Sequence, residues 1–378
     1  MSDPTFIKLH LMRSARNRHL LLIYEGDNFA RVPVRCLIQN PSFTLPENPY
    51  YREPCFANDP YFEEPTLMYR FLEVVGSCNG LLCLYGYVTN SSYEEIFLYL
   101  WNPATKTLSN KIVFLHDEFH LRKCARIKKL SLQERWQFWF GYDNSTNDYK
   151  IVAFSEMINE VRVLKLGDNV WRHIQSFPAV LLDHMISTQP FTHLGINAGV
   201  YVSGTVNWLA IPNEGSYKRS YEFKRENFIT IDQFVIISLD LSTETYRQFQ
   251  PPLEFDEVTY VEPTLAMLMD SLCFSHDFHG THFILWEMKE FGVWTQFLKI
   301  SYKSLIDFRR STLRYPCPFH LFPLCLSENG DTLILACQED HSAILYNLRH
   351  DRSDKIRNNK FIQWFCIKNY VESLVSTS

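Results

Sequence analysis

The sequence predicts an all-β protein, a β-propeller made of four-stranded blades. Three observations lead to this fold class. Short apolar runs alternate with turn-forming residues along the 378-residue chain, a strand–turn–strand pattern recurs five times, and further strand-like segments lie at both ends. Aromatic residues make up 15% and charged residues 21% of the chain, which suits large side chains buried between sheets. A propeller grows by adding blades, so a chain of this length can remain one domain.

The clearest repeat is residues 75–110, VGSCNGLLCLYGYVTNSSYEEIFLYLWNPATKTLSN. Its GSCNG turn leads into the apolar run LLCL at 81–84, and the strand IFLYLWNP ends in a turn punctuated by proline. Because LLCL has no polar alternation, both faces of this strand should be covered, as in an inner strand between neighbouring sheets. Asn102, Pro103 and, in the third repeat, Gly204 are expected to serve these turns and not a ligand.

The same pattern recurs in residues 139–174, 199–249, 265–299 and 323–356. The steps between central landmarks are 70, 56, 64 and 61 residues, counted along Leu82, Val152, Trp208, Leu272 and Leu333. These steps indicate propeller blades joined by loops of variable length. Residues 18–36 and 361–375 read as two more hairpins, which together would form one blade and close the ring. The prediction is therefore six blades, with five or seven as alternatives.

Seven segments, in order, resemble the F-box-associated propeller domain of plant F-box proteins, which is related to kelch domains. They are GSCNGLLCL, LWNPATK, FGYDNSTNDYKIV, LGDNVWRHI, GVYVSGTVNWLA, FVIISLDLSTETYRQF and YVESLVS. The resemblance runs from about residue 3 to residue 376, and as an ordered set it is specific. It implies a protein-interaction module that resembles the substrate-recognition part of an SCF (cullin-type) E3 ubiquitin ligase and binds a target protein for ubiquitination. On this reading the chain is a non-catalytic subunit.

The family carries an N-terminal F-box that binds the Skp adaptor. Residues 1–17 resemble only the end of an F-box and its linker, so the expected division is 1–17 and a propeller domain at 18–378. The three-helix F-box core is not recognised in these residues. The Skp adaptor and cullin are therefore expected partners only if an F-box is restored.

Other functional classes find little support in the sequence. A net charge of −5 and a pI of about 6.2 give no general attraction to nucleic acid or membrane, and no run of 18 apolar residues occurs. We find no catalytic motif, metal-ligand set or cofactor motif, and Cys78 is expected to be a structural thiol. The alternative is a propeller enzyme acting on a small molecule. Ten cysteines, mostly in apolar runs, read as reduced thiols of a cytoplasmic or nuclear protein.

Three variable loops supply the candidate residues for binding a partner. Their basic and aromatic side chains are of the kinds found at interfaces, and a basic loop could dock an acidic protein. A solvated loop of no binding function remains the alternative for each. The candidates are Arg122, Lys123, Lys128 and Lys129 in the first loop, Tyr217, Lys218, Arg219 and Tyr221 in the second, and Arg309 and Arg310 in the third.

Overall fold

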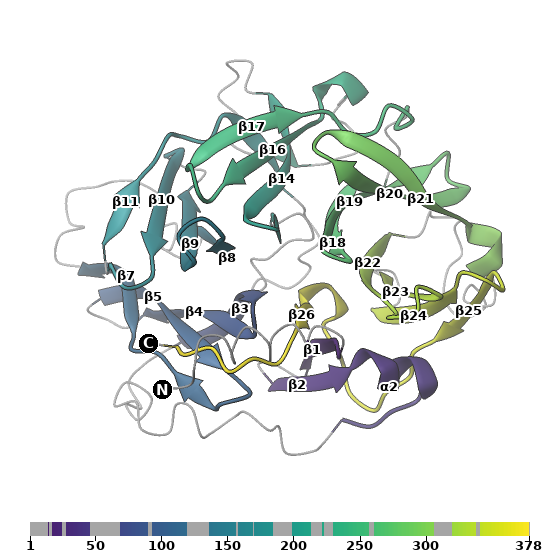
Figure 1. Ribbon diagram of the computed structural model, residues 1–378, viewed down its shortest axis with the longest axis horizontal. Helices are drawn as coiled ribbons and strands as arrows, with labels where there is room; N and C mark the ends of the chain where they lie inside the picture. Colours follow the sequence, from purple (N-terminus) through teal and green to yellow (C-terminus); the bar gives the residue numbers. More distant parts are fainter. Residues whose placement is uncertain are drawn as a thin grey trace.

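The computed structural model is a ring of six sheets, one per blade, which confirms the predicted six-bladed propeller (Figure 1). Among the described strands, all pairs are antiparallel except one short pair in blade 3. We number the blades from the first complete one along the chain, so that blade 6 combines the two chain ends. The structure describes residues 14, 17–24, 28–45, 69–89, 93–118, 136–155, 158–168, 170–183, 199–212, 221–222, 230–256, 261–305, 320–337 and 341–377.

Three blades follow the four-stranded plan, with the first strand innermost and the last at the rim. Blade 2 contains β8 (Gln137–Asp143), β9 (Asp148–Ser155), β10 (Glu160–Lys165) and β11 (Trp171–His173). Blade 4 contains β18 (Thr264–Leu268), β19 (Ser271–Phe278), β20 (His282–Glu290) and β21 (Val293–Ser301). Blade 5 contains β22 (Leu321–Leu326), β23 (Thr332–Cys337), β24 (Ser342–Asn347) and β25 (Arg352–Lys355).

Blades 1 and 3 carry extra strands. Blade 1 contains β3 (Tyr69–Cys78), β4 (Leu81–Thr89), β5 (Tyr93–Asn102), β6 (Thr107–Leu108) and β7 (Ile112–Glu118), and both β6 and β7 pair with β5. Blade 3 contains β12 (Ala179–Asp183), β13 (Val200–Val202), β14 (Thr205–Pro212), β15 (Tyr221–Glu222), β16 (Val235–Asp240) and β17 (Thr245–Phe249), with the 3₁₀ turn η4 (Ile231–Gln233) before β16. Its inner position is split, because β12 and β13 pair with opposite ends of the same edge of β14. The sequence pattern missed β12.

Blade 6 closes the ring by pairing the two chain ends. The hairpin of β1 (His19–Tyr24) and β2 (Asn28–Pro33) is completed by β26 (Lys368–Tyr370), and His19 lies opposite Tyr370. The predicted closure is therefore confirmed, but two details of it were wrong. The first predicted hairpin ends in the short helix α2 (Val34–Gln39), and residues 361–375 form no hairpin. Instead, Ile362 and Trp364 of this segment, the latter within η6 (Trp364–Cys366), bury their side chains between blades 5 and 6. Ile362 makes a single bridge to Tyr24, and only the three residues of β26 pair with β1 as a strand.

The hydrophobic core is divided into six clusters, one at each seam between neighbouring blades. The run LLCL shows why. Leu81 and Cys83 pack in the seam with blade 2, whereas Leu82 and Leu84 pack in the seam with blade 6. All four are at most 1% exposed, so both faces of this strand are covered, as its apolar sequence predicted.

Strand direction assigns each connection to one of two faces of the ring. The first-to-second and third-to-fourth strand turns share the short-turn face, at 79–80, 103–106, 144–147, 166–168, 203–204, 241–244, 269–270, 291–292, 327–331 and 348–351. The opposite face carries the strand ends that lead from second to third strands and, except after β2, from blade to blade. We call it the long-connection face, since the strand ends flanking 119–135, 213–229 and 306–319 and the start of β3 after 46–68 lie on it.

Candidate functional site

The partner-binding candidates from the sequence belong to loops between described strands. Nine of them lie outside the described residues: Arg122, Lys123, Lys128, Lys129, Tyr217, Lys218, Arg219, Arg309 and Arg310. The strand ends around them are described, however, and these lie on the long-connection face of blades 1 to 5. All three candidate loops therefore start and end on one face of the ring.

Tyr221 is the candidate whose backbone is placed. It belongs to β15, which pairs in parallel with β12, with Tyr221 opposite Leu182. Because β12 lies on the inner side of β14 in the sheet order, β15 is the innermost strand of blade 3. The second candidate loop therefore returns from the long-connection face to the axial edge of blade 3.

The connection between blades 3 and 4 presents a leucine that the sequence analysis missed. Pro251, Pro252 and Phe255 are buried, and the Phe255 N–H donates to the Pro252 carbonyl over 3.0 Å. At the tip of this turn Leu253 is 94% exposed. The buried prolines and phenylalanine hold the turn, so Leu253 is an apolar contact offered on the long-connection face in a fixed position. The signal in the sequence was PPLEF, two prolines and a phenylalanine around one leucine.

Blade 4 adds a cationic and aromatic surface near the same face. The Lys299 ammonium lies 4.2 Å from the centre of the Phe278 ring. Burial lowers the pKa of His282, and the nearby positive charges of Lys299 and Lys303 lower it further. The imidazole therefore stays neutral near pH 7, and the two lysines supply the positive charge of this surface.

Four turns on the short-turn face share one design. An Asn or Asp side-chain oxygen accepts the N–H groups two and three residues further on, and the residue after these has a positive φ of 47–57°. The turns begin at Asn102, Asp143, Asp240 and Asn347 and end at Lys106, Asn147, Glu244 and Asp351. Asx side chains are suited to this role because they can bond the backbone two residues on. The side-chain oxygens of these four residues therefore make the turns, as predicted for Asn102.

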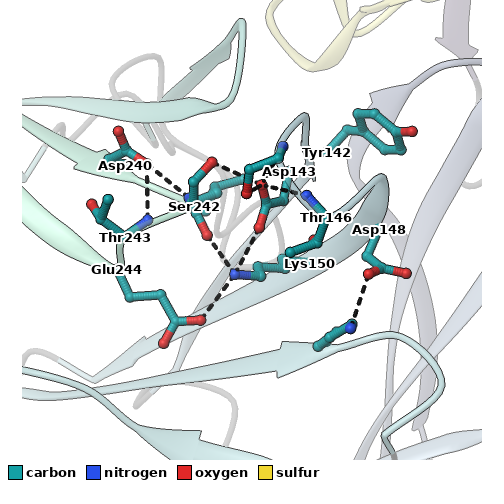
Figure 2. Close-up of polar contacts among 12 residues, drawn as sticks. Tyr142, Asp143, Thr146, Asp148, Lys150, Asp240, Ser242, Thr243 and Glu244 are labelled. Carbon is teal, nitrogen blue, oxygen red and sulfur yellow. Dashed lines mark hydrogen bonds and ion pairs between the residues drawn. The ribbon is translucent and has the colours of Figure 1, made fainter.

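A buried ion cluster joins blades 2 and 3 at this face (Figure 2). The Lys150 ammonium lies 3.1 Å from Asp143 and 3.0 Å from Glu244, which in turn pairs with Arg172 at 2.7 Å. Ser242 of blade 3 donates a 2.7 Å hydrogen bond to Asp143. Burial raises the pKa of Asp143, but hydrogen bonds from two serines and from Lys150 outweigh it and hold the pKa well below its ordinary range. Every charge here has a partner within the protein, which marks a clamp between blades.

Two described side chains of types that act in catalysis, Cys78 and His276, are held in inert states. Burial raises the pKa of the Cys78 thiol to about 12, so almost no thiolate forms at neutral pH. His276 is 3% exposed, and its Nε2 accepts the indole N–H of Trp286 over 3.1 Å. Among the described residues, no three or more His, Cys, Asp and Glu side chains gather closely enough to hold a metal ion. In the same part of the chain no helix is long and apolar enough to cross a membrane.

The chain is similar in sequence to two plant proteins and matches two solved structures at low identity. An F-box/kelch-repeat protein of Arabidopsis thaliana is 26% identical over 315 residues, covering 81% of this chain and 69% of that protein. A second Arabidopsis thaliana protein, named for an F-box, is 27% identical over 222 residues, 57% of this chain but only 38% of its own length. The nidogen/laminin complex matches with a TM-score of 0.37 at 12% identity, over 94% of this chain and 99% of that one. Pyrococcus horikoshii acylaminoacyl peptidase matches with a TM-score of 0.38 at 10% identity, over 74% and 38%.

The two structural matches are too distant to bear on function. The family comparison is more specific, because the model of the F-box associated beta propeller domain matches residues 56–377. That range takes in blades 1 to 5, the closing strand β26 and the segment after it. The chain therefore belongs to the family of F-box associated β-propeller domains.

Proposed function

We propose that this propeller is the substrate-recognition part of an SCF-type ubiquitin ligase and binds a target protein on its long-connection face. The observation that carries the proposal is the membership of the family together with the gathering of the three candidate loops on one face. Residues 119–135, 213–229 and 306–319 contain thirteen Lys and Arg against five Asp and Glu, in a chain with 37 against 42 overall. This contrast favours a target with an acidic surface.

The geometry of the chain ends fits the same proposal. The start of β1 lies on the short-turn face, since His19 is opposite Tyr370 at the end of β26. An F-box attached before residue 18 would therefore join the ring on the short-turn face and leave the opposite face open for the target. We propose the Skp adaptor and cullin as partners of a form that carries such an F-box. A cytoplasmic or nuclear location, where thiols stay reduced, suits the buried free cysteines.

Proximity labelling in plant cells, read by quantitative mass spectrometry, tests this function. The test variant carries Arg122, Lys123, Lys128 and Lys129 changed to Glu, and the control carries Lys106→Glu on the short-turn face. We expect a set of proteins to be lost with the first variant and kept with the control. A version with an F-box added before residue 18 should then raise ubiquitination of that set. If both variants label the same proteins as the unchanged chain, the first loop is not the binding surface.

A further inference from the structure

The segment after β26 packs on the short-turn face against Arg31, Gly80 and Asn102, and we call the site that these three residues form the groove. Residues 371–377 have no regular secondary structure and run from β26 over blade 1 towards its outer strands (Figure 1). Ser373 is fully buried, whereas Glu372, Leu374 and Val375 are partly buried. A chain end without strand or helix is ordinarily frayed, so the burial of this one requires specific contacts.

Asn102 provides the main-chain contacts of the groove. Its Nδ2 donates to the carbonyl of Ser373 over 3.0 Å and to that of Val375 over 2.7 Å. Its Oδ1 makes the turn, accepting the N–H of Ala104 over 2.9 Å. At Asp143 and Asp240 a carboxylate makes the same kind of turn, so an amide is not needed for the turn itself. The amide nitrogen at position 102 serves the segment that lies in the groove.

Gly80 lies in close contact with the segment at Ser373. It has a φ of +80°, and a Cβ added there would lie 2.3 Å from the Cβ of Ser373 and 2.7 Å from the carbonyl oxygen of Val371. Position 80 must therefore stay glycine for Ser373 to pack there. Ser373 is itself fully buried, so a larger side chain in its place would displace its neighbours.

Two side chains of the segment are also recognised. Arg31 pairs with Glu372 at 2.9 Å, and Val375 packs against the hydrophobic cluster between blades 1 and 2. The groove therefore contacts an acidic residue at 372, a small residue at 373 and an aliphatic residue at 375, with any residue at 374. It also binds two main-chain carbonyls, which any sequence offers.

We propose that this groove is a binding site for peptide segments of the pattern acidic–small–any–aliphatic, occupied in this structure by residues 372–375 of the chain itself. Ring closure rests on the pairing of β1 with β26, which lies before the segment, so the groove can empty while the ring stays closed. A tethered occupant has a high effective concentration, on the order of millimolar, so a competing peptide enters only when the chain's own segment is displaced.

The first experiment empties the groove in the full-length chain with Ser373→Arg. The probe is a fluorescent peptide of residues 370–378, YVESLVSTS, and the control is the same peptide with arginine in place of its serine at 373. We expect saturable binding of the probe to the S373R chain, at least about tenfold tighter than that of the control peptide, because an arginine side chain does not fit at the buried position of Ser373. Equal binding of both peptides, or binding of neither to a folded S373R chain, would overturn the proposal.

A second experiment works even if S373R does not fold. Asn102→Asp keeps the oxygen that makes the turn but replaces the donor with a carboxylate facing two carbonyls. Asn347→Asp is the matched control, since Asn347 makes the same turn in blade 5 with its Oδ1. By hydrogen-exchange mass spectrometry we expect residues 371–377 to exchange at least about tenfold faster in N102D and at the normal rate in N347D. Unchanged protection in N102D would show that Asn102 does not hold the segment.

Discussion

Replacing Lys150 with methionine should remove the centre of the clamp between blades 2 and 3. The Lys150 side chain is 5% exposed and lies between Asp143, which is 0% exposed, and Glu244, which is 14% exposed. Without the ammonium, two carboxylates face each other in a buried site. Arg172 still pairs with Glu244, but the Lys150 ion pair to Asp143 is lost.

The size of the effect follows from burial. Removing one partner of a buried ion pair typically costs about 3–5 kcal/mol, because the remaining charge has lost its compensation. With an unfolding entropy of about 2.1 cal/mol/K per residue, a cooperative chain of this length should lose about 4–6 °C of melting temperature. Lys165→Met is the control. Its ion pair with Asp148, at 2.9 Å, is 33% exposed on both sides and screened by water, so its loss should have a much smaller effect on stability.

The assay is urea unfolding of the unchanged chain, K150M and K165M, followed by tryptophan fluorescence. Calorimetry gives their melting temperatures. A double variant, Lys150→Met with Asp143→Asn, keeps the side-chain oxygen of the turn and removes the uncompensated charge, so it should recover at least half of the loss. The reasoning is refuted if K150M and K165M differ by less than about 0.5 kcal/mol, the usual range for surface substitutions. It is also refuted if the double variant is no more stable than K150M.

Three further predictions concern pH, a turn and ring closure. Burial lowers the pKa of His276, so the folded protein holds this imidazole neutral. The contribution of His276 to the stability of the protein should be fully present above its unfolded pKa of 6.5 and should be lost as the pH falls through its lower folded pKa. Melting temperatures measured over a pH series should therefore vary less in His276→Gln. Gly204 has a φ of +91° and a Cβ there would lie 3.3 Å from the Asn144 side chain, so Gly204→Val should cost about 1–3 kcal/mol in urea unfolding, while Gly204→Asn should cost less. Deleting residues 361–378 removes β26 and should abolish cooperative melting; a truncated chain that melts like the intact one would contradict closure by β1 and β26.

The sequence by itself predicted the fold class, the repeats and closure by the two ends. These features depend on local patterns. LLCL is apolar on both faces because it lies between two seams, and Asn102, Asp143 and Asp240 bond the backbone only two or three residues ahead. A pattern within a few residues is enough to show both. The neighbouring strands of most blades are also adjacent in sequence, so their pairing could be predicted as well.

Only the tertiary structure decided the features that depend on distant parts of the chain. Residues 361–375 have the composition of a hairpin, yet Trp364 and Ile362 pack against blade 5 and leave β26 as one short strand. The donor of Asn102 finds its acceptor at Ser373, 271 residues away, so no local pattern could show that this turn also holds the segment after β26. Turn geometry is set by neighbouring residues, whereas a groove exists only once separate blades and the chain end have been brought together.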